Sequence, residues 1–187
     1  MFILTVKRIT VPFDTEIVQS LKAGDRVLIS GKVYAARDAA HKRMAESLEK
    51  GEELPINIDG EVIYYVGPTP AKPGQIIGSA GPTTSGRMDK YTPELLELGL
   101  KGMIGKGYRS QDVIDSIRSN QAIYFGAIGG SGALIARTIK KVEVIAYEDL
   151  GTEAIRKMVI EDFPAIVIND SYGNDWYKQG SETYRSI

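Results

Sequence analysis

The sequence predicts a single α/β domain that is rich in strands in its N-terminal part and alternates strands with helices in its C-terminal part. Three observations support this fold class. The 187 residues, of which 43% are hydrophobic, suffice for one well-buried core. Short apolar runs dominate the first part of the chain, and from residue 92 onward apolar runs alternate with amphipathic segments. We therefore expect one domain over residues 1–187, with parallel strands joined by helices in its second part.

In the N-terminal part, the sequence pattern predicts four strands and one helix. The strands are expected at residues 2–6, 26–34, 62–66 and 75–77. Residues 38–50 are expected to form a helix that Gly51 ends. Asp38 would cap this helix, which would leave Arg37 at the end of the preceding strand. An ordinary cap beside a solvated Arg37 is an equally good local interpretation.

In the C-terminal part, strands and helices are expected in regular alternation. Thr92 and Pro93 provide a cap and a first-turn proline, a leucine stripe follows, and Gly99 ends this helix. The later helices are expected at residues 110–119, 133–139 and 152–159, and the strands at residues 102–104, 122–125, 142–146 and 165–168.

Composition and charge exclude several classes of function. A net charge of −1 and a pI of about 5.9 argue against nucleic-acid binding. No apolar run reaches the roughly 18 residues of a membrane span, and the first seven residues are too short for a signal peptide, so we expect a cytoplasmic protein without membrane contact. The chain has no cysteine and a single histidine, His41. It therefore offers no disulfide, no zinc site and no thiolate for an iron–sulfur cluster, and His41 is expected on a helix face or an interface.

The segment GPTTSGRMD at residues 81–89 fits neither a buried strand nor an amphipathic helix. Glycines and a proline restrict its backbone, the hydroxyls of Thr83, Thr84 and Ser85 follow in a row, and Arg87 stands beside them. A guanidinium binds a carboxylate or phosphate through two hydrogen bonds, and hydroxyls and loop N–H groups satisfy the remaining lone pairs. We therefore predict an anion site here, with a surface turn and a solvated Arg87 as the alternative.

A second candidate anion site is the sequence GKG at residues 105–107, where an apolar run breaks just before an expected helix start. There the Lys106 ammonium would lie beside free N–H groups that favour negative charge. Taken alone, the motif is also compatible with an ordinary turn. Arg37, Thr83 and Lys106 each directly follow an apolar run, and the carboxyl ends of strands in an α/β sheet would bring them together.

Three further segments carry weaker signals. Residues 126–132, GAIGGSG, lack the spacing and the acidic residue of a dinucleotide-binding fingerprint, so a tight strand-to-helix turn is expected. Glu148, Asp149 and Glu153 are expected in a solvated loop and at a helix start, with a partner contact as the alternative. The aromatic side chains within residues 169–177 would pack either on their own domain or on a partner.

The segment at residues 81–89 and three supporting motifs resemble the beta subunit, or C-terminal domain, of the iron–sulfur class I fumarate hydratases and the related L-tartrate dehydratases. The resemblance covers nearly the whole chain and is most specific at residues 81–89. Supporting motifs are ARDAAH at residues 36–41, GKG at residues 105–107 and YEDLGTEA at residues 147–154. The resemblance implies a swivelling β/β/α domain. It also implies a hetero-oligomer with an alpha subunit whose cysteines hold a 4Fe-4S cluster, since this chain has none.

The same resemblance implies roles for five residues. Arg37, Arg87, Lys106 and Thr84 would bind a small dicarboxylate, and Thr83 would be the catalytic base for the proton on carbon, or only a hydrogen-bonding ligand. The implied activity is the reversible hydration of fumarate to L-malate, and only together with the alpha subunit. Dehydration of L-tartrate to oxaloacetate is the alternative within the class, and a non-catalytic anion-binding or assembly module is the alternative outside it.

Overall fold

The computed structural model describes residues 5–127 and 131–184. Its strands are β1 (Val6–Thr10), β2 (Arg26–Ala35), β3 (Val62–Tyr64), β4 (Gly102–Gly105), β5 (Ile123–Gly126), β6 (Ile139–Ala146) and β7 (Ile155–Asn169). Its α-helices are α1 (Thr15–Ser20), α2 (Asp38–Glu49), α3 (Thr92–Glu97), α4 (Gln111–Ser119), α5 (Gly132–Thr138) and α6 (Trp176–Tyr184). Two short 3-10 helices, η1 (Ser85–Met88) and η2 (Glu148–Glu153), complete the described elements.

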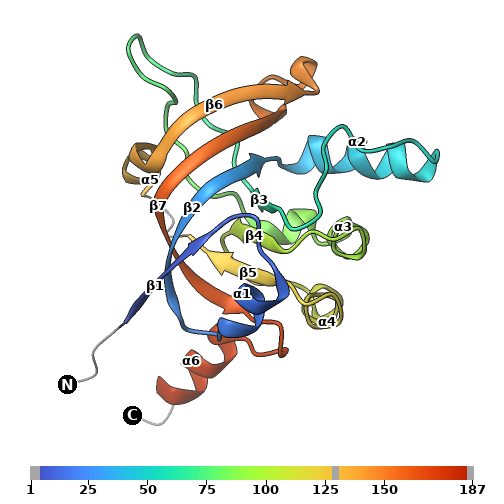
Figure 1. The fold of residues 1–187 in the computed structure, drawn as a ribbon. Coiled ribbons are helices and arrows are strands. Elements are labelled where there is room, and N and C mark those ends of the chain that lie inside the picture. The colour runs from blue at the N-terminus through green and yellow to red at the C-terminus, as the bar shows by residue number, and fades with distance from the viewer. Residues whose placement is uncertain (1–4, 128–130, 185–187) are drawn as a thin grey trace.

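All seven strands belong to one sheet, and five of them close into a ring. The order is β1-β2-β3-β4-β5-β7-β6, and β7 also pairs with β2, which joins β2, β3, β4, β5 and β7 in a circle. Strands β1 to β5 are mutually parallel, whereas β7 runs antiparallel to β2, β5 and β6. In Figure 1 the long curved strands β2 and β7 of the ring lie beside β6, and together they form the upper part of the sheet. The predicted single-domain α/β class is confirmed.

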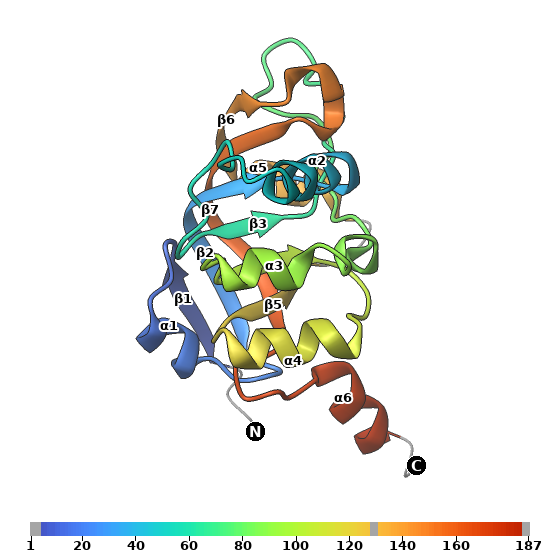
Figure 2. The same ribbon diagram turned by 90° about the vertical axis from the view of Figure 1, so that its right-hand side faces the viewer.

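Two apolar cores lie on the two sides of the ring, because side chains alternate between the faces of a strand. Tyr64, Ile104 and Phe125 point into the ring and join its inner core. Their neighbours Ile63, Met103 and Tyr124 point outward into a second core. Figure 2 shows that α2, α3 and α4 stack over this outer face. Strands β3, β4 and β5 are therefore buried on both sides, and their carboxyl ends lie at one edge of the sheet.

The structure corrects the predicted helix at residues 152–159. The 3-10 helix η2 ends at Glu153, and the fifteen-residue strand β7 starts two residues later. Residues 156–160 pair with β2 on one side and with β6 on the other. The predicted strand at residues 165–168 is the end of this same strand. Pairing on both edges outweighs a local pattern that resembles a helix.

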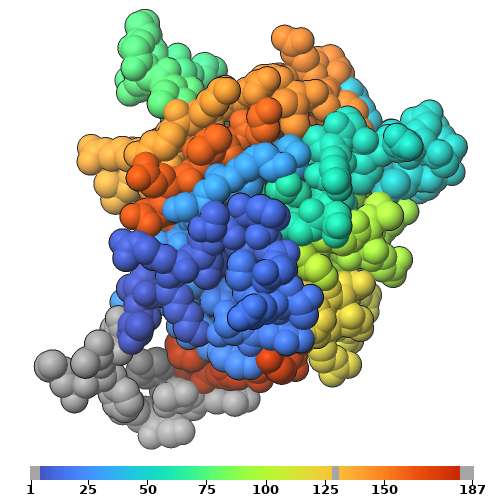
Figure 3. Space-filling model, in the orientation of Figure 1, coloured from blue at the N-terminus to red at the C-terminus, as the bar shows by residue number. Residues whose placement is uncertain are grey.

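Two other predicted strands differ from the structure. Residues 75–77 form no strand but belong to a connection between β3 and η1 that protrudes beyond β6 (Figure 3). This connection bonds to itself, with the backbone N–H of Thr69 donating to Ser79 O at 3.0 Å, and it pairs with no strand among the described residues. The strand predicted at residues 2–6 is found as β1, Val6–Thr10, and residues 1–4 lie outside the described part. Helix α1 was not predicted, although Asp14 caps it by accepting a hydrogen bond from Ile17 N at 2.8 Å.

Candidate functional site

The segment at residues 83–85 is inserted between the carboxyl ends of β3 and β4. The backbone N–H of Thr83 donates to Tyr65 O at 2.7 Å, just after β3 ends. The N–H of Lys106 donates to Thr83 O at 3.3 Å, and the N–H of Ser85 donates to Lys106 O at 2.9 Å. Thr84 and Lys106 thus form a parallel bridge that extends β4. Of the three residues predicted to meet after apolar runs, Arg37, Thr83 and Lys106, the structure brings Thr83 and Lys106 into direct backbone contact, with Thr84 beside them.

Arg37 lies one strand away, directly after β2, at the start of α2. Its guanidinium extends across Gly67, where an added Cβ would be only 2.7 Å from Arg37 Nη1, so a side chain at this position would displace the arginine. Nη2 lies 3.5 Å from the Glu153 carboxylate, and Nε lies 3.4 Å from that of Asp38. Arg37 is therefore held by two acidic groups and is not a freely solvated side chain.

The predicted cap of α2 is wrong. Asp38 is the first residue of the helix, and the N-cap residue, Arg37, makes no side-chain capping bond. Glu153 from η2 takes this role, because its carboxylate accepts a hydrogen bond from Ala39 N at 2.8 Å. Asp149, also expected in a solvated loop, binds Arg43 of α2 through two hydrogen bonds of 2.7 and 2.8 Å. The acidic segment thus fastens η2 to the start of α2.

Arg87 lies apart from Lys106 on the same edge of the molecule. Arg87 is exposed on η1 and lines an open hollow of about 440 Å³ with Asp89, Lys90 and Ser110. Lys106 lines another hollow, of about 520 Å³, with residues of β5, β7 and α6. Arg87 and Lys106 thus line two different hollows.

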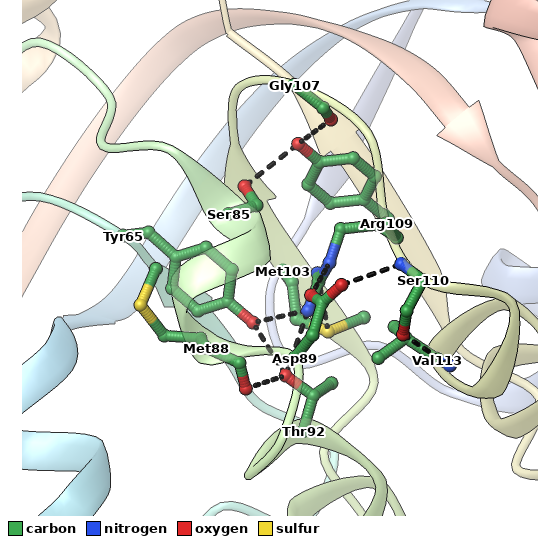
Figure 4. Close-up of polar contacts among 11 residues, drawn as sticks. Tyr65, Ser85, Met88, Asp89, Thr92, Met103, Gly107, Arg109, Ser110 and Val113 are labelled. Atoms are coloured by element: carbon green, nitrogen blue, oxygen red, sulfur yellow. Dashed lines mark hydrogen bonds and ion pairs between the residues drawn. The ribbon is translucent and has the colours of Figure 1, made fainter.

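A buried ion pair beneath these loops was not predicted from the sequence. Figure 4 shows the Arg109 side chain, which has no solvent exposure, with its Nε donating to Asp89 Oδ1 at 2.7 Å. Arg109 also donates to Thr92 Oγ1 at 2.9 Å and lies over the rings of Tyr65 and Tyr124. Burial alone would lower the pKa of Arg109, but Tyr65 and Asp89 raise it above its ordinary value. Asp89 ends the segment at residues 81–89 and Arg109 lies two residues after the GKG motif, yet their pairing is visible only in three dimensions.

A second buried contact joins the same two loops. The Tyr124 hydroxyl donates to Gly107 O at 2.9 Å, and the Ser85 hydroxyl lies 2.9 Å from the Tyr124 oxygen. Burial raises the pKa of Tyr124, so this hydroxyl keeps its proton. We call Ser85, Asp89, Arg109 and Tyr124 the loop clamp.

Comparison with known proteins identifies the family of the chain. The family model for the fumarase C-terminus matches residues 5–180. The chain belongs to this family. A class I aerobic fumarate hydratase of Salmonella typhimurium is 41% identical over 88% of the chain, and an anaerobic one of Escherichia coli is 43% identical over 82%. A protein of Methanocaldococcus jannaschii, provisionally named L(+)-tartrate dehydratase subunit beta, is 35% identical over 87% of the chain.

The lengths of these relatives differ. The chain spans only 28–29% of the fumarate hydratases but 86% of the archaeal subunit beta. In the longer relatives, the fumarase C-terminus is thus one part of a larger protein.

His41 of this family member is a buried structural residue, on a helix face as predicted. Its ring lies edge-on against Tyr65, with the ring centroids 5.3 Å apart. Burial lowers the pKa of His41 to about 4, so the imidazole is neutral near neutral pH. Nδ1 lies 2.8 Å from Arg37 O and must carry the proton, which leaves Nε2 buried and without a partner.

The donor set of the chain does not fit an iron–sulfur cluster. The sequence has no cysteine, and the described residues contain no group of three or more His, Asp or Glu side chains that could hold a metal ion.

No helix among these residues is long and apolar enough to cross a membrane. The turn predicted at residues 126–132 lies partly outside the described residues. Of the C-terminal aromatics, Tyr177 packs on Tyr108 of the same domain.

Proposed function

We propose that this chain is the beta subunit of a class I iron–sulfur hydro-lyase that reversibly hydrates fumarate to L-malate. One observation carries the proposal: residues 83–85 are inserted between β3 and β4, beside Lys106 and one strand away from Arg37. Hydroxyls and cations thereby gather at one strand edge in a chain that is 41–43% identical to class I fumarate hydratases. This grouping suits a small molecule with two carboxylates.

Charge supports the assignment of Arg37, Arg87 and Lys106 as dicarboxylate ligands. Arg87 and Lys106 form no ion pair with any other residue in the described part of the chain, so each has capacity for an external anion. Arg37 is oriented by Asp38 and Glu153, and its remaining N–H groups are left for a carboxylate. Thr84, exposed beside Lys106, adds a hydroxyl donor.

Thr83 is the proposed catalytic residue. In hydration of fumarate, one alkene carbon gains a hydroxyl group and the other gains a proton. In the reverse direction, Thr83 Oγ would take that carbon proton, and in hydration it would return it. A threonine hydroxyl is a very weak acid, so this role requires positive charge nearby. The Lys106 ammonium and the Arg37 guanidinium are the candidates in this chain, and both lose water when a second polypeptide covers the edge.

The cluster is proposed to belong to a partner alpha subunit, because this chain offers no thiolate. No step assigned above passes through the cluster. The name of the archaeal relative supports a separate beta subunit, and the low coverage of the fumarate hydratases supports a larger complete enzyme. The same relative makes L-tartrate the second candidate substrate, since tartrate also presents two carboxylates.

The test is anaerobic co-expression of the chain with a cysteine-containing alpha subunit, followed by assays with fumarate, L-malate and L-tartrate. We expect hydration of fumarate and dehydration of malate. Dehydration of tartrate without activity on fumarate would establish the alternative substrate. A stable assembly with a complete cluster that acts on none of the three would leave this chain as an anion-binding or assembly module.

A further inference from the structure

Two loops carry the proposed ligands, and one buried hydroxyl joins them. Tyr124 lies on β5, with its ring in the outer core and without solvent exposure. Its single hydroxyl proton goes to Gly107 O, directly after Lys106. Ser85 must therefore donate its own proton to the Tyr124 oxygen. The result is a hydrogen-bond chain from the loop of Thr83 and Thr84, through Tyr124, to the loop of Lys106.

The packing around this chain leaves little freedom for either loop to shift. Ser85 is fully buried, and its Oγ would lie 2.0 Å from a Cβ added at Gly105. Gly107 has a φ of +85°, in the left-handed region that favours glycine. Ser85 and Gly107, at the two ends of this hydrogen-bond chain, are thus held in place. The Tyr124 hydroxyl between them therefore sets the spacing of the two loops.

The ion pair of the loop clamp holds the other ends of the same loops. Asp89 accepts from Arg109 Nε with one oxygen and from the backbone N–H of Ser110 with the other, at 2.6 Å. Arg87 lies between Ser85, the first residue of its short helix, and Asp89, the residue after the helix, so both ends of η1 are anchored. Loss of one partner of a buried ion pair is strongly destabilising, which makes Arg109 and Asp89 poor sites for a functional test.

We propose that Tyr124 is a positioning residue whose hydroxyl sets the spacing between Thr83–Thr84 and Lys106, and with it the fit of a dicarboxylate. Tyr124 lies beneath the two loops and, in this inference, does not touch the substrate. The inference rests on the proposed function for its catalytic consequence, while its structural consequence can be measured on the chain itself.

The structural test uses amide hydrogen exchange in the full chain. Tyr124→Phe removes both hydrogen bonds and keeps the ring, and Ser85→Ala removes only one of them. We expect exchange at the Thr83, Ser85 and Lys106 amides to rise roughly tenfold in Tyr124→Phe and less in Ser85→Ala, because each buried hydrogen bond contributes modestly to local stability. The matched control is Tyr147→Phe, since the Tyr147 hydroxyl is buried without a partner. Should Tyr124→Phe fail to fold, Ser85→Ala carries the test.

A variant that combines Tyr124→Phe with Ser85→Ala distinguishes positioning by the Tyr124 hydroxyl from a general increase in amide exchange. If Ser85 acts only through the Tyr124 hydroxyl, the double variant should exchange no faster than Tyr124→Phe alone, whereas independent effects would add. In the assembled enzyme, we expect the KM for the dicarboxylate to rise roughly tenfold in Tyr124→Phe, with the same non-additivity, and to stay unchanged in Tyr147→Phe.

Exchange in Tyr124→Phe that equals the exchange in the Tyr147→Phe control would overturn the inference. Loosened amides with an unchanged KM would also overturn it, since the spacing would then not govern the site. A wild-type assembly that lacks hydratase activity would count against the proposed function instead, and the exchange result would still decide whether Tyr124 sets the loop spacing.

Discussion

The Thr83 hydroxyl can be removed without disturbing the backbone that holds it, because its structural contacts are made by its N–H and C=O groups. We expect Thr83→Ala in the assembled enzyme to keep its affinity for dicarboxylates and to turn over ~10²–10⁴ times more slowly, the usual contribution of a positioned base. Thr83→Ser should retain part of the activity. Steady-state kinetics check this, and a raised KM with near-normal kcat would make Thr83 a ligand instead of the base.

Arg37 provides a test of geometry at constant charge. Arg37→Lys keeps a cation but loses the planar fork that reaches both Glu153 and a substrate carboxylate, so we expect weaker inhibitor binding by about 1.5–3 kcal/mol. The matched control is Arg43→Lys on the same helix, whose two bonds to Asp149 lie at the exposed surface. Titration with a dicarboxylate inhibitor measures both variants. If the Arg37→Lys and Arg43→Lys variants bind the inhibitor with equal affinity, Arg37 is not a ligand of the dicarboxylate.

His41 predicts a pH dependence of stability. Its folded pKa of about 4 lies below the value of 6.5 expected in the unfolded chain. As the pH falls from about 6.5 to about 4, the unfolded chain therefore binds a proton that the folded chain does not, and the free energy of unfolding decreases. The slope for this one proton is at most about 1.4 kcal/mol per pH unit.

The same dependence should disappear in a His41→Phe variant, which keeps a buried ring. Urea unfolding at pH 7 and at pH 5 measures the difference for each protein. The carboxylates contribute equally to both proteins, so only the difference between them reports on His41. A wild-type protein and a variant that lose the same stability at pH 5 would contradict a neutral buried imidazole.

At the scale of elements, strand β4 has no room for a side chain at Gly105. An added Cβ would lie 2.0 Å from Ser85 Oγ and 2.9 Å from the Tyr65 ring. We therefore expect Gly105→Ala to lower the free energy of unfolding by about 1–3 kcal/mol, as overpacking does. Gly180→Ala on α6 is the control, because no atom lies within 4 Å of its Cβ position. Thermal unfolding should show a decrease for the first variant and no decrease for the second.

Elements with strong local signals were predictable from the sequence, and elements defined by distant partners were not. Helix α2 and strand β2 were placed within one residue, because an apolar run and a following glycine mark them. The first half of β7 was taken for a helix, since its pairing with β2 and β6 is determined by residues far away in the chain. The protruding residues 75–77 show the reverse case, an apolar run that forms no strand.

The residues of the candidate site were likewise predictable where local signals mark them and not where distant partners define them. Arg37, Thr83 and Lys106 were expected to meet because strand ends in a parallel sheet share an edge, and Thr83 and Lys106 do so while Arg37 lies one strand away. The loop clamp could not be expected, since nothing in a sequence distinguishes the buried Arg109 from the exposed Arg87. Glu153 was expected at the start of its own helix and instead caps α2 from another part of the fold.

At the scale of the whole molecule, the chain forms its own apolar cores, whereas the proposed function requires a partner. Both apolar cores are filled by its own residues, so we expect the isolated chain to fold. It should bind no iron and show no hydratase activity, because it has no cysteine and its cations line separate open hollows. Circular dichroism, metal analysis and a fumarate assay on the purified chain test this. Measurable hydration after removal of metal would contradict the proposed dependence on a partner.

The ring has a consequence for how the protein is made. Strand β7 pairs with β2, β5 and β6, so each of these three strands lacks its β7 partner until residues 155–169 leave the ribosome. Contacts between segments so far apart form slowly, and unpaired strand edges recruit other chains in the meantime. Translation that stops before residue 155 would release a fragment with all three edges open. Such fragments are expected to aggregate, and they would be substrates for chaperones or proteases and not for assembly into an enzyme.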